Sequence, residues 1–210
     1  QSAGEVKLID DGMDIGSGQS GDVEFNNLVI RVDNTKDMNT VGQIFVQADD
    51  FTLNDSELYA QNVSDTNSPD ISIGIEVNNF SAVSSNLTLM AVGKGNAGMI
   101  KLNATEKVLF SGGIGSKSQI TTAAFSNEDG AGDGGKILIK ATDIELTDVA
   151  IDSSTFGKGN AGKILLIAKE IITIDETTNE LPIISSGVAN DTSSGKGGFI
   201  GLSAPEIILK

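Results

Sequence analysis

The sequence contains no cysteine, no histidine and no tryptophan, and each absence removes a class of chemistry. Without cysteine there are no disulfides, and without cysteine or histidine there is no ordinary zinc, haem or iron–sulfur site. The lack of histidine also excludes a Ser-His-Asp triad and an imidazole acid–base catalyst near neutral pH. The sequence therefore predicts no cofactor and no conventional catalytic centre.

Positive charge is also scarce: the chain has 14 lysines and arginines and 29 aspartates and glutamates, which gives a net charge of −15. Such a surface repels phosphate backbones, so we expect no nucleic-acid partner, and anionic membranes are disfavoured for the same reason. The sequence has no run of 18 apolar residues, and therefore no membrane-spanning helix is predicted. The start Gln1-Ser2-Ala3-Gly4 lacks an initiator methionine, which suggests a processed or excised piece.

What the chain does contain is an alternation of apolar and polar residues in short runs, the period of half-buried β-strands. Almost every run follows a glycine by one residue, and Pro69 takes that place in the fourth run. No segment keeps the apolar spacing of an amphipathic helix for long, so we predict an all-β fold. The runs are Val6-Lys7-Leu8, Val23-Glu24-Phe25, Ile44-Phe45-Val46, Ile71-Ser72-Ile73, Ile100-Lys101-Leu102, Ile137-Leu138-Ile139, Ile164-Leu165-Leu166 and Ile200-Gly201-Leu202.

A second pattern follows each run at a fixed distance. An alanine lies six residues after the glycine in five units, at Ala48, Ala104, Ala141, Ala168 and Ala204. Two further apolar residues usually follow the alanine, and several units then contain a third run, as at Leu58, Ile151 and Ile184. The predicted unit is therefore strand, bend, strand, bend, strand and loop.

Units of this kind, repeated every ~20–40 residues, indicate a β-solenoid. A β-sandwich also has short strands, but it has no reason to keep the glycine-to-alanine register. We predict one solenoid over residues 1–210 with about eight coils, irregular over 1–41 and regular over 42–210. The segment 111–134 is the longest interruption of the pattern, and we expect it to form a long, ligand-facing loop.

The sharpest motif precedes the glycine of each regular unit. It reads GKGNAG at 93–98, GAGDGG at 130–135, GKGNAG at 157–162 and a shortened GKGG at 195–198. Glycine permits a positive φ, and asparagine or aspartate tolerates the left-handed region, so we interpret the motif as one repeated structural turn. We also expect the asparagines to form a hydrogen-bonded column. The turn residues are Gly93, Gly95, Asn96, Gly98, Gly130, Gly132, Asp133, Gly135, Gly157, Gly159, Asn160 and Gly162.

The run GKGNAGKILLIA, with a further apolar strand and Ser-Ser, resembles the repeats of filamentous-haemagglutinin-like exoproteins, which bacteria export by two-partner secretion. The resemblance is good over 93–210, fair over 42–92 and weak over 1–41. It implies a right-handed parallel β-helix that is secreted or held on the cell surface and works as an adhesin or extracellular fibre. The Asn-Pro-Asn export signature of that family is absent, so the resemblance implies a piece of the shaft and no catalytic residues.

Carboxylates are the remaining candidates for chemistry. They cluster around Asp10 and Asp14, Asp49 and Asp55, Glu128 and Asp133, and Asp175 and Glu176. No pair recurs at a spacing that forces both members onto one face, so we interpret them as a solvated acidic surface and predict no enzyme. Glu128, Asp129 and Asp133 are candidate ligands for a weakly bound calcium ion, because their turn is similar to those of calcium-binding β-rolls.

The sequence thus favours a structural or adhesive segment, either the shaft of an adhesin or the subunit of a self-assembling filament. The rung pattern reaches both ends without a capping helix, so we expect uncapped ends that bind a second copy or the remainder of a longer chain. A surface carbohydrate or protein is a further expected partner. The alternative is a β-helix that binds or degrades polysaccharides through its carboxylates, with Asp129 and Asp133 tested first.

Overall fold

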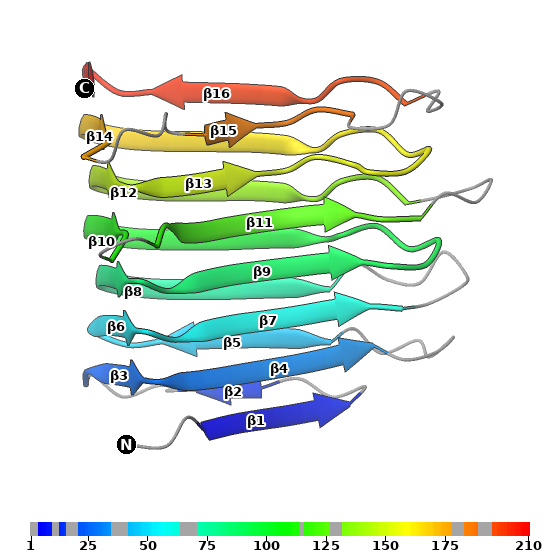
Figure 1. Ribbon diagram of the computed structural model, residues 1–210. Coiled ribbons are helices and arrows are strands. Elements are labelled where there is room, and N and C mark those ends of the chain that lie inside the picture. The colour runs from blue at the N-terminus through cyan, green and yellow to red at the C-terminus, as the bar shows by residue number, and fades with distance from the viewer. Residues whose placement is uncertain are drawn as a thin grey trace.

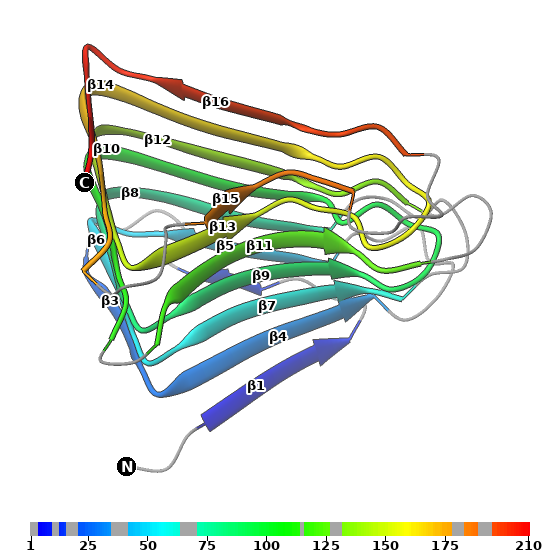
Figure 2. The same cartoon turned by 45° about the horizontal axis from the view of Figure 1, so that its top comes forward.

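The fold is a stack of parallel coils, seen side-on in Figure 1 and obliquely in Figure 2. The computed structural model describes residues 4–9, 13–15, 21–34, 42–63, 71–113, 116–126, 132–177, 183–188 and 195–210. These residues form strands and no helix, so the prediction of an all-β solenoid is confirmed. In this part of the chain, accordingly, there is no helix long and apolar enough to cross a membrane.

Each regular coil has three sides, and the outline is triangular in Figure 2. A long bent strand supplies two sides and a shorter strand supplies the third. The third sides form a seven-stranded sheet, here called sheet A: β1 (Gly4–Ile9), β4 (Leu28–Asn34), β7 (Glu57–Asn62), β9 (Asn86–Ala91), β11 (Ser118–Ala124), β13 (Val149–Asp152) and β15 (Ile183–Ser185).

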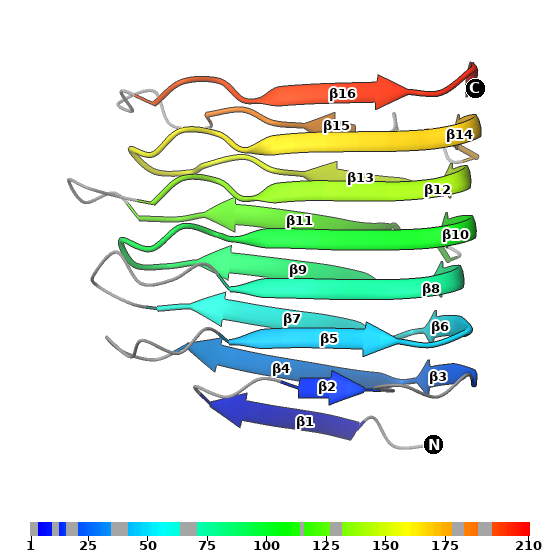
Figure 3. The same cartoon turned by 180° about the vertical axis from the view of Figure 1, so that it is seen from behind.

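The other two sides form sheet B, which lies nearest the viewer in Figure 3. Its first side consists of β2 (Met13–Ile15), β5 (Gln43–Gln47), the first halves of β8 (Ser72–Val83), β10 (Met99–Ser111), β12 (Lys136–Thr147) and β14 (Lys163–Asp175), and β16 (Phe199–Ser203). Its second side consists of β3 (Val23–Asn26), β6 (Asp50–Asn54), the second halves of β8, β10, β12 and β14, and β17 (Glu206–Leu209). A register shift next to Ala104 and Ala141 marks the bend between the two sides.

Every pairing between named strands is parallel, and equivalent residues of successive coils lie side by side. The alternation seen in the sequence therefore becomes columns of one residue type running through the stack. One inward column has isoleucine in six successive coils, at Ile44, Ile73, Ile100, Ile137, Ile164 and Ile200. The first five are fully buried, and each burial contributes roughly 1.5–3 kcal/mol.

Aromatic rings fill the part of the core that lies behind the second side of sheet B. Phe25, Phe51, Phe80 and Phe110 form a chain of contacts with centroid separations of 5.3, 5.6 and 5.0 Å. The first two contacts are edge-to-face, an arrangement that adds stability beyond the buried area. The core is thus continuous along the stack and is not divided into separate clusters between coils.

One predicted boundary is wrong. Residues 111–134, expected as one long loop, contain strand β11, which pairs with both β9 and β13. The strand does not show the apolar alternation because Ser118 and Thr122 occupy inward positions, and Thr122 pairs with Leu89 of β9. Small and polar residues are tolerated there because the neighbouring coils already supply the core.

The predicted equivalence of the first, second and fourth apolar runs also needs correction. The run at Val6 belongs to sheet A and the run at Val23 to the second side of sheet B, so neither is equivalent to the run at Ile44. In the fourth unit the position that matches Gly98 is Ile71 and not Pro69, since Met99 pairs with Ser72. Pro69 itself lies outside the described residues. The right hand of the helix, the count of about eight coils and the single domain stay predictions.

Candidate functional site

The repeated turn forms a ladder of short polar side chains on one edge of the stack. Asn96 Oδ1 accepts a hydrogen bond from the Asp133 backbone N–H at 3.0 Å, and Asp133 Oδ1 accepts one from the Asn160 N–H at 2.8 Å. Asn160 Oδ1 in turn accepts from the Lys196 N–H at 3.0 Å. Each side chain therefore satisfies a backbone donor of the next coil, which makes this turn ladder a structural device.

The glycines of the turn are required because successive coils approach one another closely. A Cβ at Gly98 would lie 1.9 Å from the Ile71 carbonyl oxygen, and its φ is 82°. A Cβ at Gly162 would lie 1.8 Å from the Gly135 oxygen. Similar clashes would arise at Gly132, Gly135, Gly157, Gly195 and Gly198. Gly93, Gly95 and Gly159 lie in the same turns, and Gly130 lies outside the described residues.

The left-handed conformation expected for the asparagines is found elsewhere. Among the described non-glycine residues, positive φ values occur at Asn27, Asp55, Ser84 and Asp148, and so not at Asn96, Asp133 or Asn160. Asparagine and aspartate suit this turn because their side chains accept a hydrogen bond from the next coil, and not because of their backbone conformation. The four left-handed residues mark a different corner, between the second side of sheet B and sheet A.

That second corner carries a serine ladder that the sequence reasoning missed. The hydroxyl of Ser85 accepts from the Ser56 backbone N–H at 3.0 Å, and the hydroxyl of Ser118 accepts from the Ser85 N–H at 3.1 Å. These serines are buried, and each hydroxyl also donates to a carbonyl of its own coil. The signal was present in the dipeptides Asp55-Ser56 and Ser84-Ser85, which separate two apolar runs.

The turn ladder borders a shallow hollow of about 270 Å³. Polar and glycine residues line it, including Asn96, Asp133, Lys136 and Lys163. Asp133 was a candidate calcium ligand, but its Oδ1 accepts the hydrogen bonds from Asn160, and Glu128 and Asp129 lie outside the described residues. Nowhere among the residues that the structure describes do three Asp or Glu side chains come together as a metal-binding group. The calcium site stays a prediction.

The carboxylates at the bend between the two sides of sheet B bind amides of the next coil. Asp49 Oδ1 accepts from Asn78 Nδ2 at 3.3 Å, and Asp50 Oδ1 accepts from Asn79 Nδ2 at 2.9 Å. Asp49 and Asn78 border a shallow hollow of about 430 Å³ that is also lined by Glu76, Asn103 and Thr105. These hydrogen bonds account for the two aspartates without a catalytic role. Asp10 and Asp11 lie outside the described residues, as does the side chain of Asp14.

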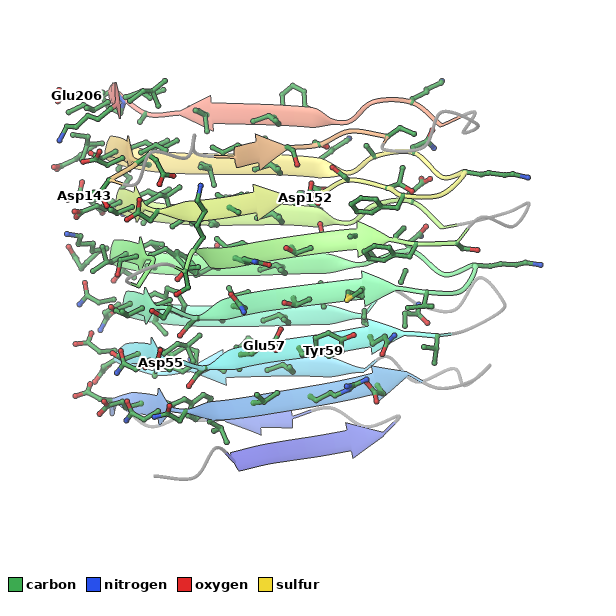
Figure 4. All side chains as sticks on the ribbon, in the orientation of Figure 1. Asp55, Glu57, Tyr59, Asp143, Asp152 and Glu206 are labelled. Atoms are coloured by element: carbon green, nitrogen blue, oxygen red, sulfur yellow. The ribbon has the colours of Figure 1, made fainter. Side chains whose placement is uncertain are left out.

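The other carboxylates are distributed over different faces. Figure 4 shows Asp55, Asp143 and Glu206 along one side of the stack, whereas Glu57 and Asp152 lie on sheet A. Glu176 forms an ion pair with Lys117 at 3.0 Å, and both side chains are mostly buried. Asp175 lies 3.9 Å from Lys210 Nζ. Several of the described carboxylates thus take part in contacts between coils, whereas Asp143 Oδ1 is buried without a hydrogen-bond partner.

The outer face of sheet A holds the single tyrosine of the chain beside the single arginine. The Arg31 guanidinium lies 4.7 Å from the centre of the Tyr59 ring, and Arg31 also binds Asp33 and Gln61. Burial raises the pKa of the Tyr59 hydroxyl, the Arg31 charge lowers it, and Asp33 and Glu57 raise it, with a net shift upward. This cluster joins two neighbouring strands, β4 and β7, through charge and stacking.

Comparisons of the chain with protein-family models, with curated proteins and with solved structures gave no match. The resemblance to filamentous-haemagglutinin-like repeats therefore rests on the turn motif and its spacing.

Proposed function

We propose that the chain is a structural segment of a secreted or cell-surface bacterial exoprotein, and that it serves as a stiff shaft or as the subunit of an extracellular filament. The observation that carries the proposal is the continuity of the inter-coil contacts. The isoleucine column, the turn ladder and the serine ladder each run through several coils. Such columns resist bending because every coil is bonded to its neighbours on all three sides.

The chemistry of the described carboxylates agrees with a structural role. Asp49, Asp133 and Glu176 bind groups from other coils and so stabilise the stack. A glycoside hydrolase would instead need two carboxylates facing one groove. The pattern of bonds therefore favours a shaft over the polysaccharide-degrading alternative.

The apolar surface of the last coil supports association along the axis. Ile207 and Leu209 are 42% and 67% exposed, and a hollow beside them is lined by Ile174, Ile184, Ile200 and Leu202. Exposed apolar area of this kind is typical of a face that another coil covers. A second copy or a further part of a longer chain would supply that coil.

Immunogold electron microscopy of the producing cells tests the proposal. Antibodies against the purified chain should label intact, unpermeabilised cells, either along extracellular fibres or in a layer on the cell surface. Labelling that appears only after permeabilisation would contradict an exterior shaft. As a control for non-specific labelling, the experiment is repeated with antibodies that have been pre-incubated with an excess of the purified chain.

A further inference from the structure

The outer face of sheet B concentrates the lysines of an acidic chain. Three adjacent strands present a grid of outward residues there, with Met99, Lys101 and Asn103 from β10, Lys136, Leu138 and Lys140 from β12, and Lys163, Leu165 and Ile167 from β14. We call this grid the lysine face, and it lies toward the viewer in Figure 3. It contains four lysines and no carboxylate, although the whole chain has a net charge of −15.

Most of these lysines form no ion pair in the described part of the chain, and Asp133, which borders the same hollow as Lys136 and Lys163, accepts hydrogen bonds from Asn160. Lys101 pairs with Glu76 at 3.3 Å, in an ion pair that is open to solvent. Lys136, Lys140 and Lys163 form no ion pair with any residue in the described ranges. In a chain with twice as many acidic as basic residues, three lysines on one face that form no ion pair are unexpected.

Two of the lysines also repel each other. Lys136 and Lys163 lie directly opposite one another on adjacent strands, at the spacing of one rung. Like charges in this position destabilise a sheet, and a bound anion would remove the penalty. Lysines often protect the edge of a sheet from aggregation, but β12 and β14 are paired on both sides, so that role does not explain them.

Apolar side chains lie between the charges. Leu138 and Leu165 are neighbours in the central column of the grid, and both are half-exposed, as are Met99 and Ile167. On the lysine face, apolar side chains therefore lie between positively charged ones. A ligand that fits this surface has regularly spaced negative charges and apolar surfaces between them.

We propose that the lysine face binds a uronate polysaccharide that lies along the solenoid axis, with carboxylates directed to Lys136 and Lys163, which share one column on one flank, and to Lys140 on the other flank. A pyranose ring is about as long as one rung is high, so successive sugars meet successive strands. The apolar faces of the rings cover Leu138 and Leu165. Nucleic acid suits the site less well, because its denser charge is repelled by the acidic remainder of the chain. This inference rests on the face alone and holds whether or not the chain serves as a shaft.

Binding of the intact chain to immobilised alginate tests the proposal, with neutral dextran as the control polymer. We expect saturable binding to alginate that weakens as salt is raised, and no binding to dextran. The variant K136Q/K140Q/K163Q should lose at least tenfold in affinity. The matched variant K158Q/K169Q/K196Q, which removes three exposed lysines outside the lysine face, should keep the affinity of the unmodified chain.

Circular dichroism and thermal unfolding of both variants establish that they remain folded. Absence of alginate binding by the unmodified chain would overturn the proposal, and so would equal losses in the two triple variants. Preferential binding to duplex DNA or to vesicles containing phosphatidylglycerol, measured in the same assay, would assign the face to another partner. Salt-sensitive self-association without alginate binding would also overturn the proposal, and it would show that the lysine face binds a second copy of the chain.

Discussion

At the scale of single residues, the fold is most demanding where the backbone of one coil passes directly over the next. Gly162 occupies such a position, since a Cβ there would meet both the Gly135 carbonyl oxygen and the Ser153 hydroxyl. The constraint comes from neighbouring coils and not from the turn's own conformation. Glycines without such neighbours, as at Gly197, should therefore be replaceable.

Replacing Gly162 with alanine should lower the free energy of unfolding by about 3 kcal/mol, because the added methyl group overpacks a close backbone contact. The control is Gly197→Ala, where nothing lies within 4 Å of the new Cβ and almost no change is expected. Urea unfolding of the two variants measures the difference. Equal stabilities would contradict the close stacking of the turns.

A second residue-scale prediction concerns Thr122, which is fully buried and whose hydroxyl has no hydrogen-bond partner. Valine has the same shape without the polar atom, so Thr122→Val should stabilise the protein by about 1 kcal/mol. Thermal unfolding provides the measurement. The neighbouring outward residue gives the control, and Thr121→Val should have little effect.

The ionisation of Tyr59 can be followed directly, because the chain has one tyrosine and no tryptophan. Burial raises the pKa of Tyr59 above its ordinary value of about 10, and Arg31→Gln should raise that pKa further by removing the nearby cation. The folded protein holds the phenolic proton more tightly than the unfolded chain. Its contribution to stability is therefore complete below the ordinary pKa and is lost as pH rises through the folded value.

Tyrosinate absorbance as a function of pH measures this titration in the unmodified chain and in Arg31→Gln. An upward shift on removal of the arginine is the expected result. A downward shift would show that the guanidinium does not face the ring as described.

At the scale of the strands, the sequence predicted the regular elements and missed those with unusual inward residues. Strands such as β12 and β14 alternate isoleucine and leucine with polar residues, and the glycine before them fixes where they begin. Strand β11 was missed because Ser118 and Thr122 interrupt the apolar alternation. The position of β11 is determined by its pairing with the strands on either side, and the sequence of the segment alone does not show that pairing.

The turn ladder could be predicted in part. The repeat of Asn96, Asp133 and Asn160 at equivalent positions indicated a column, because identical turns on adjacent coils bring these side chains together. The partner atoms could not be predicted, since the acceptors bind backbone groups whose direction depends on the path of the next coil. The ion pair between Lys117 and Glu176 was also missed, since 59 residues separate its members.

This ion pair joins the coil of β11 to the coil of β14 across the coil between them. Its side chains are 14% and 6% exposed, so Lys117→Met would leave a mostly buried carboxylate without its cation. We expect a loss of about 3 kcal/mol in the free energy of unfolding. Removing both charges in K117M/E176L should restore most of that loss, as measured by urea unfolding. A double variant as unstable as the single one would contradict this role.

At the scale of the whole molecule, the properties of the chain follow from parallel, in-register stacking. The same stacking aligns the isoleucines in the core, the asparagines in the turns and the lysines on the outer face of sheet B. The shape was predictable from the recurring glycine-to-alanine distance. The lysine face was not, because the outward lysines become neighbours only when the coils are placed in register.

The most direct test of this account is a distance measured along the stack. Gln43 and Phe199 occupy one outward column of sheet B, separated by five steps of the strand register. Because the chain has no native cysteine, spin labels on Gln43→Cys and Phe199→Cys can be read by double electron–electron resonance without other changes. We predict one narrow distribution near ~24 Å, five times the spacing between paired strands. A broad distribution, or one centred far beyond that distance, would contradict a rigid stack of parallel coils.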